Sequence, residues 1–219
     1  FRKAGAKVKT SVFRNLTEQD VFDSIDEMKK NIDECQILMF CGGFSAGDEP
    51  DGSGKFIANV LNNEKIAAAI EALIARGGLI LGICNGFQAL VKSGLLPYGH
   101  LGTVTKDSPT LFRNDINRHI SQIAFTRVAS VNSPWLAGMN IGDTYAIPVS
   151  HGEGKFVVNE ELAKELFENG QVAFQYAEPV DEGVSMHSPY NPNGSYYAIE
   201  GIISKNGQIL GKMGHSERY

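Results

Sequence analysis

The sequence has few cysteines, no long apolar run and no excess of positive charge. The three cysteines (Cys35, Cys41 and Cys84) are odd in number and widely spaced, which argues against a disulfide framework and a CxxC metal site. Reduced thiols and a cytoplasmic location are the simpler expectation. Cys35 and Cys41 lie at the ends of one apolar run, so we expect both to be buried strand residues. No apolar run approaches the length of a membrane span.

The charge balance is mildly acidic. Lys and Arg number 20 against 25 Asp and Glu, for a net charge of −5, and no basic cluster stands out. This argues against nucleic acid or a membrane surface as the main partner. The length of 219 residues suits one large domain. The chain lacks an initiator Met, and its first residues, FRKAGAKV, resemble the end of a helix that runs into a strand. We therefore expect a piece of a longer polypeptide.

The first half alternates between strand and helix patterns. Gln36–Cys41 is a short apolar run that we predict to be a strand buried on both faces. Phe56–Arg76 carries apolar residues at helical spacing and predicts one helix. Leu79–Ile83 is the next strand, followed by an amphipathic helix up to Lys92. This order is typical of a βαβ unit in a parallel sheet.

The second half is richer in strand patterns. Ile123–Val131 and Thr144–Val149 are predicted strands, and Glu160–Phe167 is a predicted helix with Asn159 as its N-cap. Residues 172–176 alternate, which favours a half-exposed strand.

A β-hairpin is predicted near the C-terminus. Gly201–Lys205 and Gln208–Met213 flank Asn206-Gly207, a pair typical of a type I′ turn with positive φ at both central positions. Thr103–Asn117 is polar, and we expect an excursion from the core there. Together these elements predict an α/β fold with a mainly parallel open sheet, flanked by helices, of the flavodoxin-like kind.

The most informative motif surrounds Cys84. Gly82-Ile83-Cys84-Asn85-Gly86 places G-x-C-x-G between a predicted strand and a predicted helix, as in a nucleophile elbow. Glycines on either side would avoid clashes at a sharp turn. The helix N-terminus would lower the thiol pKa, and the Asn85 N–H would face a developing oxyanion. A buried structural cysteine is the alternative.

A second glycine-rich segment, Gly42–Asp48, follows the other buried strand. Adjacent parallel strands would bring this loop to the same carboxyl edge of the sheet as Cys84. It could supply a second oxyanion N–H, or it could be a plain tight connection. The phosphate-binding pattern G-x-x-x-x-G-K-[ST] is absent.

A thiol nucleophile usually needs a base. The histidines are His100, His119, His151, His187 and His215. His151 and His215 each begin an H-x-E sequence after a predicted strand, so spacing does not choose between them. His187 is a weaker candidate.

Several motifs together resemble a known family. GICNGFQ, GGFSAGD and the terminal GHSER are similar to the class I (triad) glutamine amidotransferases, and SHGEG and NPNGS also match the glutaminase domain of phosphoribosylformylglycinamidine synthase. The resemblance covers nearly the whole chain. GGFSAGDEPDGSGKFI is similar to the version that is fused to a long single-chain synthase.

This resemblance implies a role for individual residues. Cys84 would be the nucleophile, His215 the base and then the acid, and Glu217 the group that orients His215. The residues implied for the oxyanion hole and the glutamine pocket are Gly43, Phe44, Asn85, Gln88, His151 and Gly152.

The implied activity is glutamine amide hydrolysis. Its ammonia would serve the ATP-dependent conversion of formylglycinamide ribonucleotide to formylglycinamidine ribonucleotide in purine biosynthesis. The domain itself would need no metal or cofactor, since ATP and Mg²⁺ would belong to a synthetase domain on the same polypeptide. A γ-glutamyl hydrolase or peptidase-like thiol enzyme and a non-catalytic interaction domain are the alternatives.

Family members begin with a strand that is absent here and continue past the H-x-E. We therefore expect residues 1–219 to be a C-terminal glutaminase domain shortened at both ends.

Overall fold

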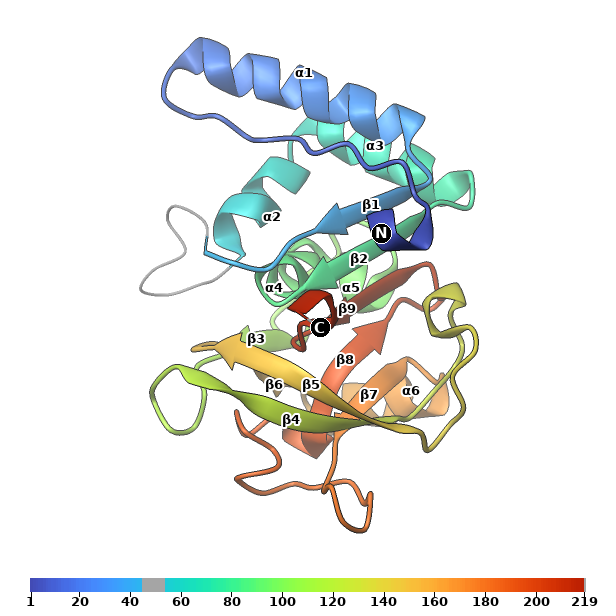
Figure 1. Cartoon of the computed structure of the whole chain (residues 1–219). Coiled ribbons are helices and arrows are strands. Elements are labelled where there is room, and N and C mark those ends of the chain that lie inside the picture. The colour runs from blue at the N-terminus through green and yellow to red at the C-terminus, as the bar shows by residue number, and fades with distance from the viewer. Residues whose placement is uncertain (45–53, 219) are drawn as a thin grey trace.

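A seven-stranded sheet runs through the molecule (Figure 1). The computed structural model describes residues 1–44 and 54–218. The strand order is β1-β2-β9-β8-β7-β4-β5, and β3 and β6 form a separate pair. The strands are β1 Ile37–Phe40, β2 Leu79–Ile83, β3 Thr110–Phe112, β4 Ile120–Val128, β5 Thr144–His151, β6 Lys155–Val157, β7 Val172–Tyr176, β8 Ile199–Ile203 and β9 Ile209–Lys212.

The sheet is parallel at one end and antiparallel at the other. β2 pairs in parallel with both β1 and β9, whereas the pairs from β9 through β5 are antiparallel. The predicted α/β class and the βαβ unit are confirmed, and the sheet as a whole is mixed. The reason lies in the connections. Parallel neighbours need a long crossover, while a tight turn such as that between β8 and β9 forces antiparallel pairing.

Most of the helices lie against the parallel half of the sheet, whereas the last one lies beside β7 in the antiparallel half (Figure 1). They are α1 Glu18–Glu34, α2 Lys55–Leu61, α3 Glu64–Ala75, α4 Asn85–Ser93, α5 Leu95–Tyr98 and α6 Glu160–Glu168, with short 3₁₀ turns η1 Arg2–Ala4, η2 Pro134–Leu136, η3 Tyr196–Ala198 and η4 Ser216–Arg218. α1 lies alongside α3 next to β1 (Figure 1), and α4 packs on β2 and β9.

The prediction of one continuous helix over Phe56–Arg76 is wrong, because two helices, α2 and α3, occupy this range. α2 ends before Asn62, and the side chain of Asn63 accepts a hydrogen bond from the Lys65 N–H at 3.1 Å to cap α3. Asn is favoured at an N-cap because its side chain satisfies an otherwise unpaired N–H. The predicted cap at Asn159 is confirmed, since its side chain accepts from the Leu162 N–H at 2.8 Å.

The N-terminal segment differs from the expectation of a helix running into a strand. A 3₁₀ turn ends at Gly5 with φ 84°, and no strand forms in the described residues 5–17. The long helix α1 follows, which the sequence analysis did not predict. Thr17 begins α1 with a reciprocal capping box to Asp20.

Two predictions of strand burial are reversed. Ile37 of β1 is 39% exposed, because β1 is an edge strand rather than one covered on both faces. Val172, Phe174 and Tyr176 of β7 are buried as an alternating strand requires, but Ala173 between them is buried as well, because β7 lies inside the sheet between β8 and β4. β7 is therefore not the half-exposed strand that the alternation predicted. The position of a strand in the sheet therefore decided burial more than the local pattern did.

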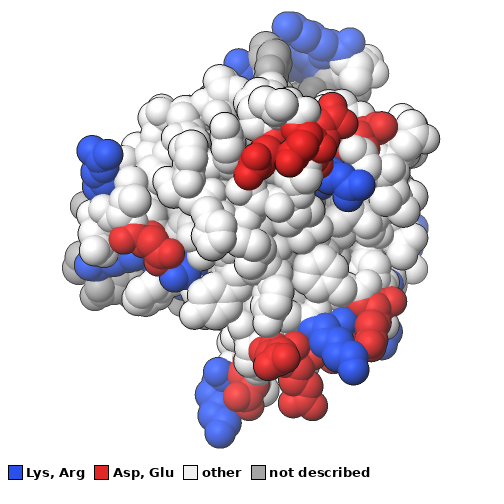
Figure 2. Space-filling model, turned by 90° about the horizontal axis from the view of Figure 1, so that it is seen from below, with Lys and Arg blue, Asp and Glu red and all other residues white. Residues whose placement is uncertain are grey.

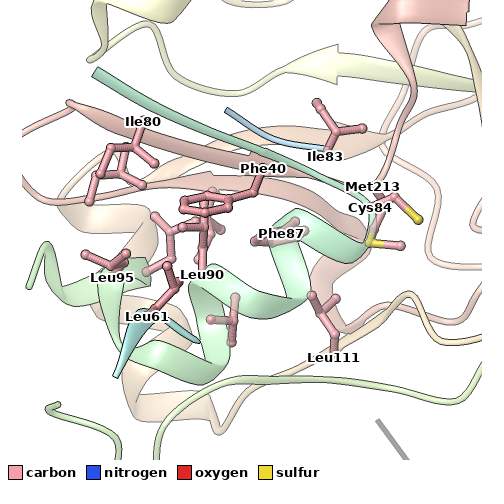
Figure 3. Packing of buried hydrophobic residues seen from close by; sticks show 14 of the residues in the cluster. Phe40, Leu61, Ile80, Ile83, Cys84, Phe87, Leu90, Leu95, Leu111 and Met213 are labelled. Carbon is pink, nitrogen blue, oxygen red and sulfur yellow. The ribbon is translucent and has the colours of Figure 1, made fainter. Parts of the chain in front are cut away.

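The core occupies both faces of the sheet. Figure 3 shows Phe40, Phe87 and Leu90 lying together between α4 and the strands. Successive strand residues point to opposite faces, so Ile202 and Ile209 join this larger cluster, whereas their neighbours Ile203 and Leu210 join a smaller one. The smaller cluster contains Phe174 and Leu136.

The predicted C-terminal hairpin is confirmed, but the predicted type I′ turn is wrong. The Gly207 N–H donates to the Ser204 carbonyl at 2.8 Å, and Gly207 has φ 73°. Asn206 does not have positive φ, so the loop is a type I turn followed by a left-handed glycine. The predicted excursion over Thr103–Asn117 contains the short strand β3, which pairs with β6.

Charged groups are dispersed over the face seen in Figure 2. Basic and acidic side chains lie there in mixed groups near the rim, and most of the centre is uncharged. Among the helices in residues 1–44 and 54–218, none is both long and apolar enough to span a membrane.

We predict that Gly86→Ala strongly destabilises the fold. A Cβ at this position would lie 2.1 Å from the Phe40 carbonyl oxygen and 2.8 Å from the Phe40 Cβ, so α4 must move away from β1. The expected loss is about 3 kcal/mol in the free energy of unfolding, measured by urea denaturation. Gly152→Ala is the matched control, because the nearest atom to its Cβ is 4.0 Å away. Equal stability of the two variants would contradict the close packing of α4 on β1.

Candidate active site

Cys84 occupies a strained turn between β2 and α4. Its φ is 50° and its ψ is −106°, a conformation that costs a non-glycine residue energy and recurs at functional sites. Its N–H donates to the Lys212 carbonyl at 2.9 Å. A Cβ on Gly82 would lie 2.8 Å from Gly86 backbone atoms, so the flanking glycines permit the turn as the sequence predicted.

The Cys84 thiol is buried, and burial decides its protonation state. Burial raises the pKa of the thiol above its ordinary value. The N–H groups of Asn85 and Gly43, which are directed at the sulfur, and the charge of Arg218 lower the pKa but do not cancel the effect of burial. The expectation that the N-terminus of α4 lowers this pKa overall is wrong. A neutral thiol is therefore the resting form at neutral pH, and its activation requires a base.

His215 is held next to Cys84 by a carboxylate. The Nδ1 atom of His215 lies 2.6 Å from Oε1 of Glu217, and His215 is 1% exposed. With Nδ1–H donating to Glu217, the free nitrogen is Nε2, which is buried and has no hydrogen-bond partner among the described residues. This tautomer is the one that can accept a proton at Nε2.

Gly42 brings Cys84 and His215 close together. A Cβ on Gly42 would lie 2.7 Å from Cε1 of His215 and 3.3 Å from Cβ of Cys84. Only a residue without a side chain fits between them. In this state the thiol faces the Ser150 carbonyl at 3.8 Å.

His151 is a buried neutral residue in the pocket wall. Its Nε2 accepts from the side-chain amide of Asn193 at 3.1 Å, and its Nδ1 has no hydrogen-bond partner in the described part of the chain. Burial, followed by the charges of His119 and His215, lowers the pKa of His151 to about 3. Neither ring nitrogen of His151 is hydrogen-bonded to a carboxylate, whereas His215 is paired with Glu217. The geometry therefore favours His215 as the base.

A pocket opens above Cys84. Its wall is formed by Gly43, Phe44, Cys84, Gln88, Ser150, His151, Gly152, Glu153, His215 and Arg218. The side chain of Gln88 donates to the Glu153 carbonyl, and its own oxygen has no hydrogen-bond partner among the described residues. Asn85 contributes its N–H, and Glu217 lies behind His215.

The structure thus brings the predicted site residues into one place, and it adds three. Ser150 and Glu153 adjoin the predicted pair His151 and Gly152 within SHGEG, and Arg218 follows the H-x-E sequence. Proximity to those motifs was the signal that could have found them. His100 and His187 are not in the pocket wall as described. Ser45–Asp48, predicted as part of the second loop, lie outside the described residues.

The described residues contain no group of three or more His, Cys, Asp or Glu side chains that could hold a metal ion. The available chemistry is a buried thiol, a carboxylate-oriented imidazole and two N–H groups converging on the sulfur. This arrangement can perform nucleophilic attack on an acyl group.

The chain resembles a known protein family over its full length. All 219 residues match the model of the CobB/CobQ-like glutamine amidotransferase domain. The chain belongs to this family.

Similar members of the amidotransferase family act in one named enzyme. The chain is 36% identical over 220 residues to a protein of Methanococcus maripaludis strain C5 named phosphoribosylformylglycinamidine synthase subunit PurQ, covering 100% of this chain and 76% of that protein. The PurQ subunit of Gloeobacter violaceus is 33% identical over 188 residues, covering 86% of this chain and 73% of that protein. Among solved structures, PurLQS from Thermotoga maritima matches with a TM-score of 0.63 and 29% identity over 85% of this chain and 71% of that chain.

The environments of the cysteines predict an order of alkylation. Cys41 is exposed and Cys35 is half-buried, so the prediction that both are buried strand residues is wrong. We expect iodoacetamide at neutral pH to modify Cys41 first, because Cys84 is buried and its pKa is raised. Peptide mapping over time gives the order, with Cys41→Ser as the control. Faster modification of Cys84 than of Cys41 would contradict a neutral resting thiol.

The neutral state of His151 predicts a pH dependence of stability. The unfolded chain takes up a proton at this histidine below its ordinary pKa of 6.5, while the folded chain does so only near about 3. Folding stability from this group is therefore present above pH 6.5 and is lost as the pH falls towards about 3. Relative to His151→Gln, the wild type should lose up to about 1.4 kcal/mol of unfolding free energy per pH unit. Urea denaturation across this range measures the difference, and parallel curves would refute a buried neutral His151.

Proposed function

We propose that this chain is the glutaminase of a phosphoribosylformylglycinamidine synthase, in which Cys84, His215 and Glu217 act as a catalytic triad. The observation that carries the proposal is the convergence at Gly42. There the Glu217-oriented ring of His215 and the Cys84 side chain meet, and two N–H groups are directed at the sulfur. The membership in the amidotransferase family and the names of its relatives support the same substrate.

The first chemical step forms a thioester. The Cys84 thiol turns from the Ser150 carbonyl to His215, transfers its proton to Nε2, and the sulfur attacks the side-chain amide carbon of glutamine. The N–H groups of Asn85 and Gly43, already directed at the sulfur, then stabilise the oxyanion on the tetrahedral intermediate. The imidazolium returns the proton to the departing nitrogen, ammonia leaves, and the γ-glutamyl thioester remains.

The second step hydrolyses the thioester. His215 removes a proton from water, the resulting hydroxide adds to the thioester carbonyl, and glutamate leaves as the thiol is restored. Glu217 stabilises the imidazolium in both steps because its carboxylate accepts from Nδ1–H at 2.6 Å. The substrate itself would lie against Phe44, Gln88 and the main chain of His151-Gly152 in the pocket.

The ammonia would then serve a synthetase partner. The relatives are subunits of a synthase, and a related solved structure is a PurLQS assembly. We propose that the partner converts formylglycinamide ribonucleotide to formylglycinamidine ribonucleotide and holds the ATP and Mg²⁺. The resemblance of GGFSAGDEPDGSGKFI to the fused version favours a partner on the same polypeptide, and the length of the native polypeptide tests this point.

A glutamine-like electrophile tests the proposal directly. We expect 6-diazo-5-oxo-norleucine to form one adduct, on Cys84, with protection by glutamine, because the pocket orients the reagent where a simple alkylating agent is slow. Intact mass and peptide mapping identify the site. Cys84→Ala should abolish the adduct and lower glutaminase activity by several orders of magnitude while the fold remains intact.

The control is Cys41→Ser, which should keep both the adduct and the activity. Activity that persists in Cys84→Ala would exclude the triad. Turnover of γ-glutamyl peptides in preference to glutamine would indicate the γ-glutamyl hydrolase alternative. No adduct on folded protein, even with the synthetase partner present, would indicate a non-catalytic domain.

A further inference from the structure

Two charged side chains are buried beneath the turn that carries His215 and Glu217. Lys212 on β9 is 6% exposed, and Glu200 on the neighbouring strand β8 is 1% exposed. Burying a charge is costly unless it is paired or hydrogen-bonded. Apolar packing does not offset the cost of burying these two charges, so the explanation lies in the contacts that each side chain makes.

Lys212 contacts both Cys84 and the turn that carries His215 and Glu217. Its carbonyl accepts the Cys84 N–H at 2.9 Å, and its Nζ donates to Oγ of Ser216 at 3.2 Å. Its ammonium also lies 4.7 Å from the centre of the Phe174 ring, a favourable cation–π contact. One residue therefore contacts the nucleophile through its main chain and the residue between His215 and Glu217 through its side chain.

Glu200 holds the other side of His215. Its Oε1 accepts the Gly214 N–H at 2.5 Å, and its carbonyl accepts the Met213 N–H at 3.2 Å. Its Oε2 is buried without a hydrogen-bond partner among the described residues. Gly214 and Ser216, which flank His215 in the chain, are thus each fixed by a buried charged side chain.

The pKa of Lys212 depends on its burial and on two nearby carboxylates. Burial lowers the pKa of Lys212, while the carboxylates of Glu200 and Glu217 raise it. The Lys212 ammonium is thus the positive charge that faces both carboxylates from inside the sheet. Removing the ammonium would take away its electrostatic attraction to the carboxylates of Glu200 and Glu217.

We propose that Lys212 is a positioning residue for the triad: through Ser216 it fixes the turn that aligns Glu217 with His215. This inference rests on the proposed function, because the alignment matters only if His215 is the base. Lys212 does not touch the substrate or the sulfur with its side chain. Its role is to limit the positions that the Glu217 carboxylate can take, which holds Nδ1 of His215 against Glu217 and leaves Nε2 for the thiol.

Lys212→Met tests the proposal, because Met keeps an unbranched stem over Phe174 and removes the ammonium. We expect kcat for glutamine to fall on the order of tenfold, the size typical of losing one hydrogen bond to a charged group, with little change in KM. We also expect the downfield proton resonance of His215 Nδ1–H to shift or broaden. The assays use the complete protein with its synthetase part.

Two further variants separate positioning from folding. Ser216→Ala removes only the acceptor at an exposed position and should reproduce the loss in kcat. The double variant should be no slower than Lys212→Met alone, because both changes break the same contact. Lys205→Met, at an exposed lysine in the β8–β9 turn, is the matched control and should leave kcat and the resonance unchanged.

The outcomes also separate this inference from the proposed function. Wild-type kcat and an unchanged His215 resonance in both folded variants would overturn the role of Lys212. Should Lys212→Met fail to fold, the same result in Ser216→Ala alone would overturn it. A wild type without glutaminase activity would refute the proposed function, while a shifted resonance in the variants would still support Lys212 as the residue that fixes the turn.

Discussion

The parallel pairing of β2 with both β1 and β9 is the constraint on which the site depends. It brings three chain segments to one edge of the sheet: the glycine turn after β1, the elbow at Cys84 after β2, and the turn at His215 after β9. A shift of one residue in either register would move the Gly42 backbone or the His215 ring away from the thiol. The N–H of Cys84 also donates to the carbonyl of Lys212, so the hydrogen bonds between β2 and β9 continue one residue past Ile83 into the elbow.

The site gathers polar groups where a core would ordinarily be apolar. Cys84, His151, His215, Glu200 and Lys212 are all buried. Each costs desolvation energy, and several keep an atom without a hydrogen-bond partner among the described residues. The apolar clusters on both faces of the sheet supply the stability that offsets these costs. Preorganised donors and acceptors of this kind need no rearrangement when charge develops on a substrate.

The sequence predicted those features that depend on local chemistry. The strand–turn–helix around Cys84, the Asn159 cap and the C-terminal hairpin follow from glycine, capping and turn preferences, and all three are present. The features that it missed depend on tertiary context. The exposure of β1, the burial of β7 and the raised pKa of Cys84 arise from neighbours distant in the chain. Spacing did not separate His215 from His151, since both histidines begin the same H-x-E pattern, and only the family resemblance implied His215. The positions of Glu217 and Asn193 add a physical reason for that preference.

The burial of the Cys84 thiol also bears on how long the protein remains usable under oxidising conditions. Oxidation to sulfenic and then sulfinic acid begins from an accessible thiolate, and the resting site offers a buried neutral sulfur instead. The exposed thiol of Cys41, two residues before Gly43, meets peroxide first. In the proposed mechanism, the same burial that makes Cys84 dependent on a base also protects its sulfur from irreversible damage between turnovers.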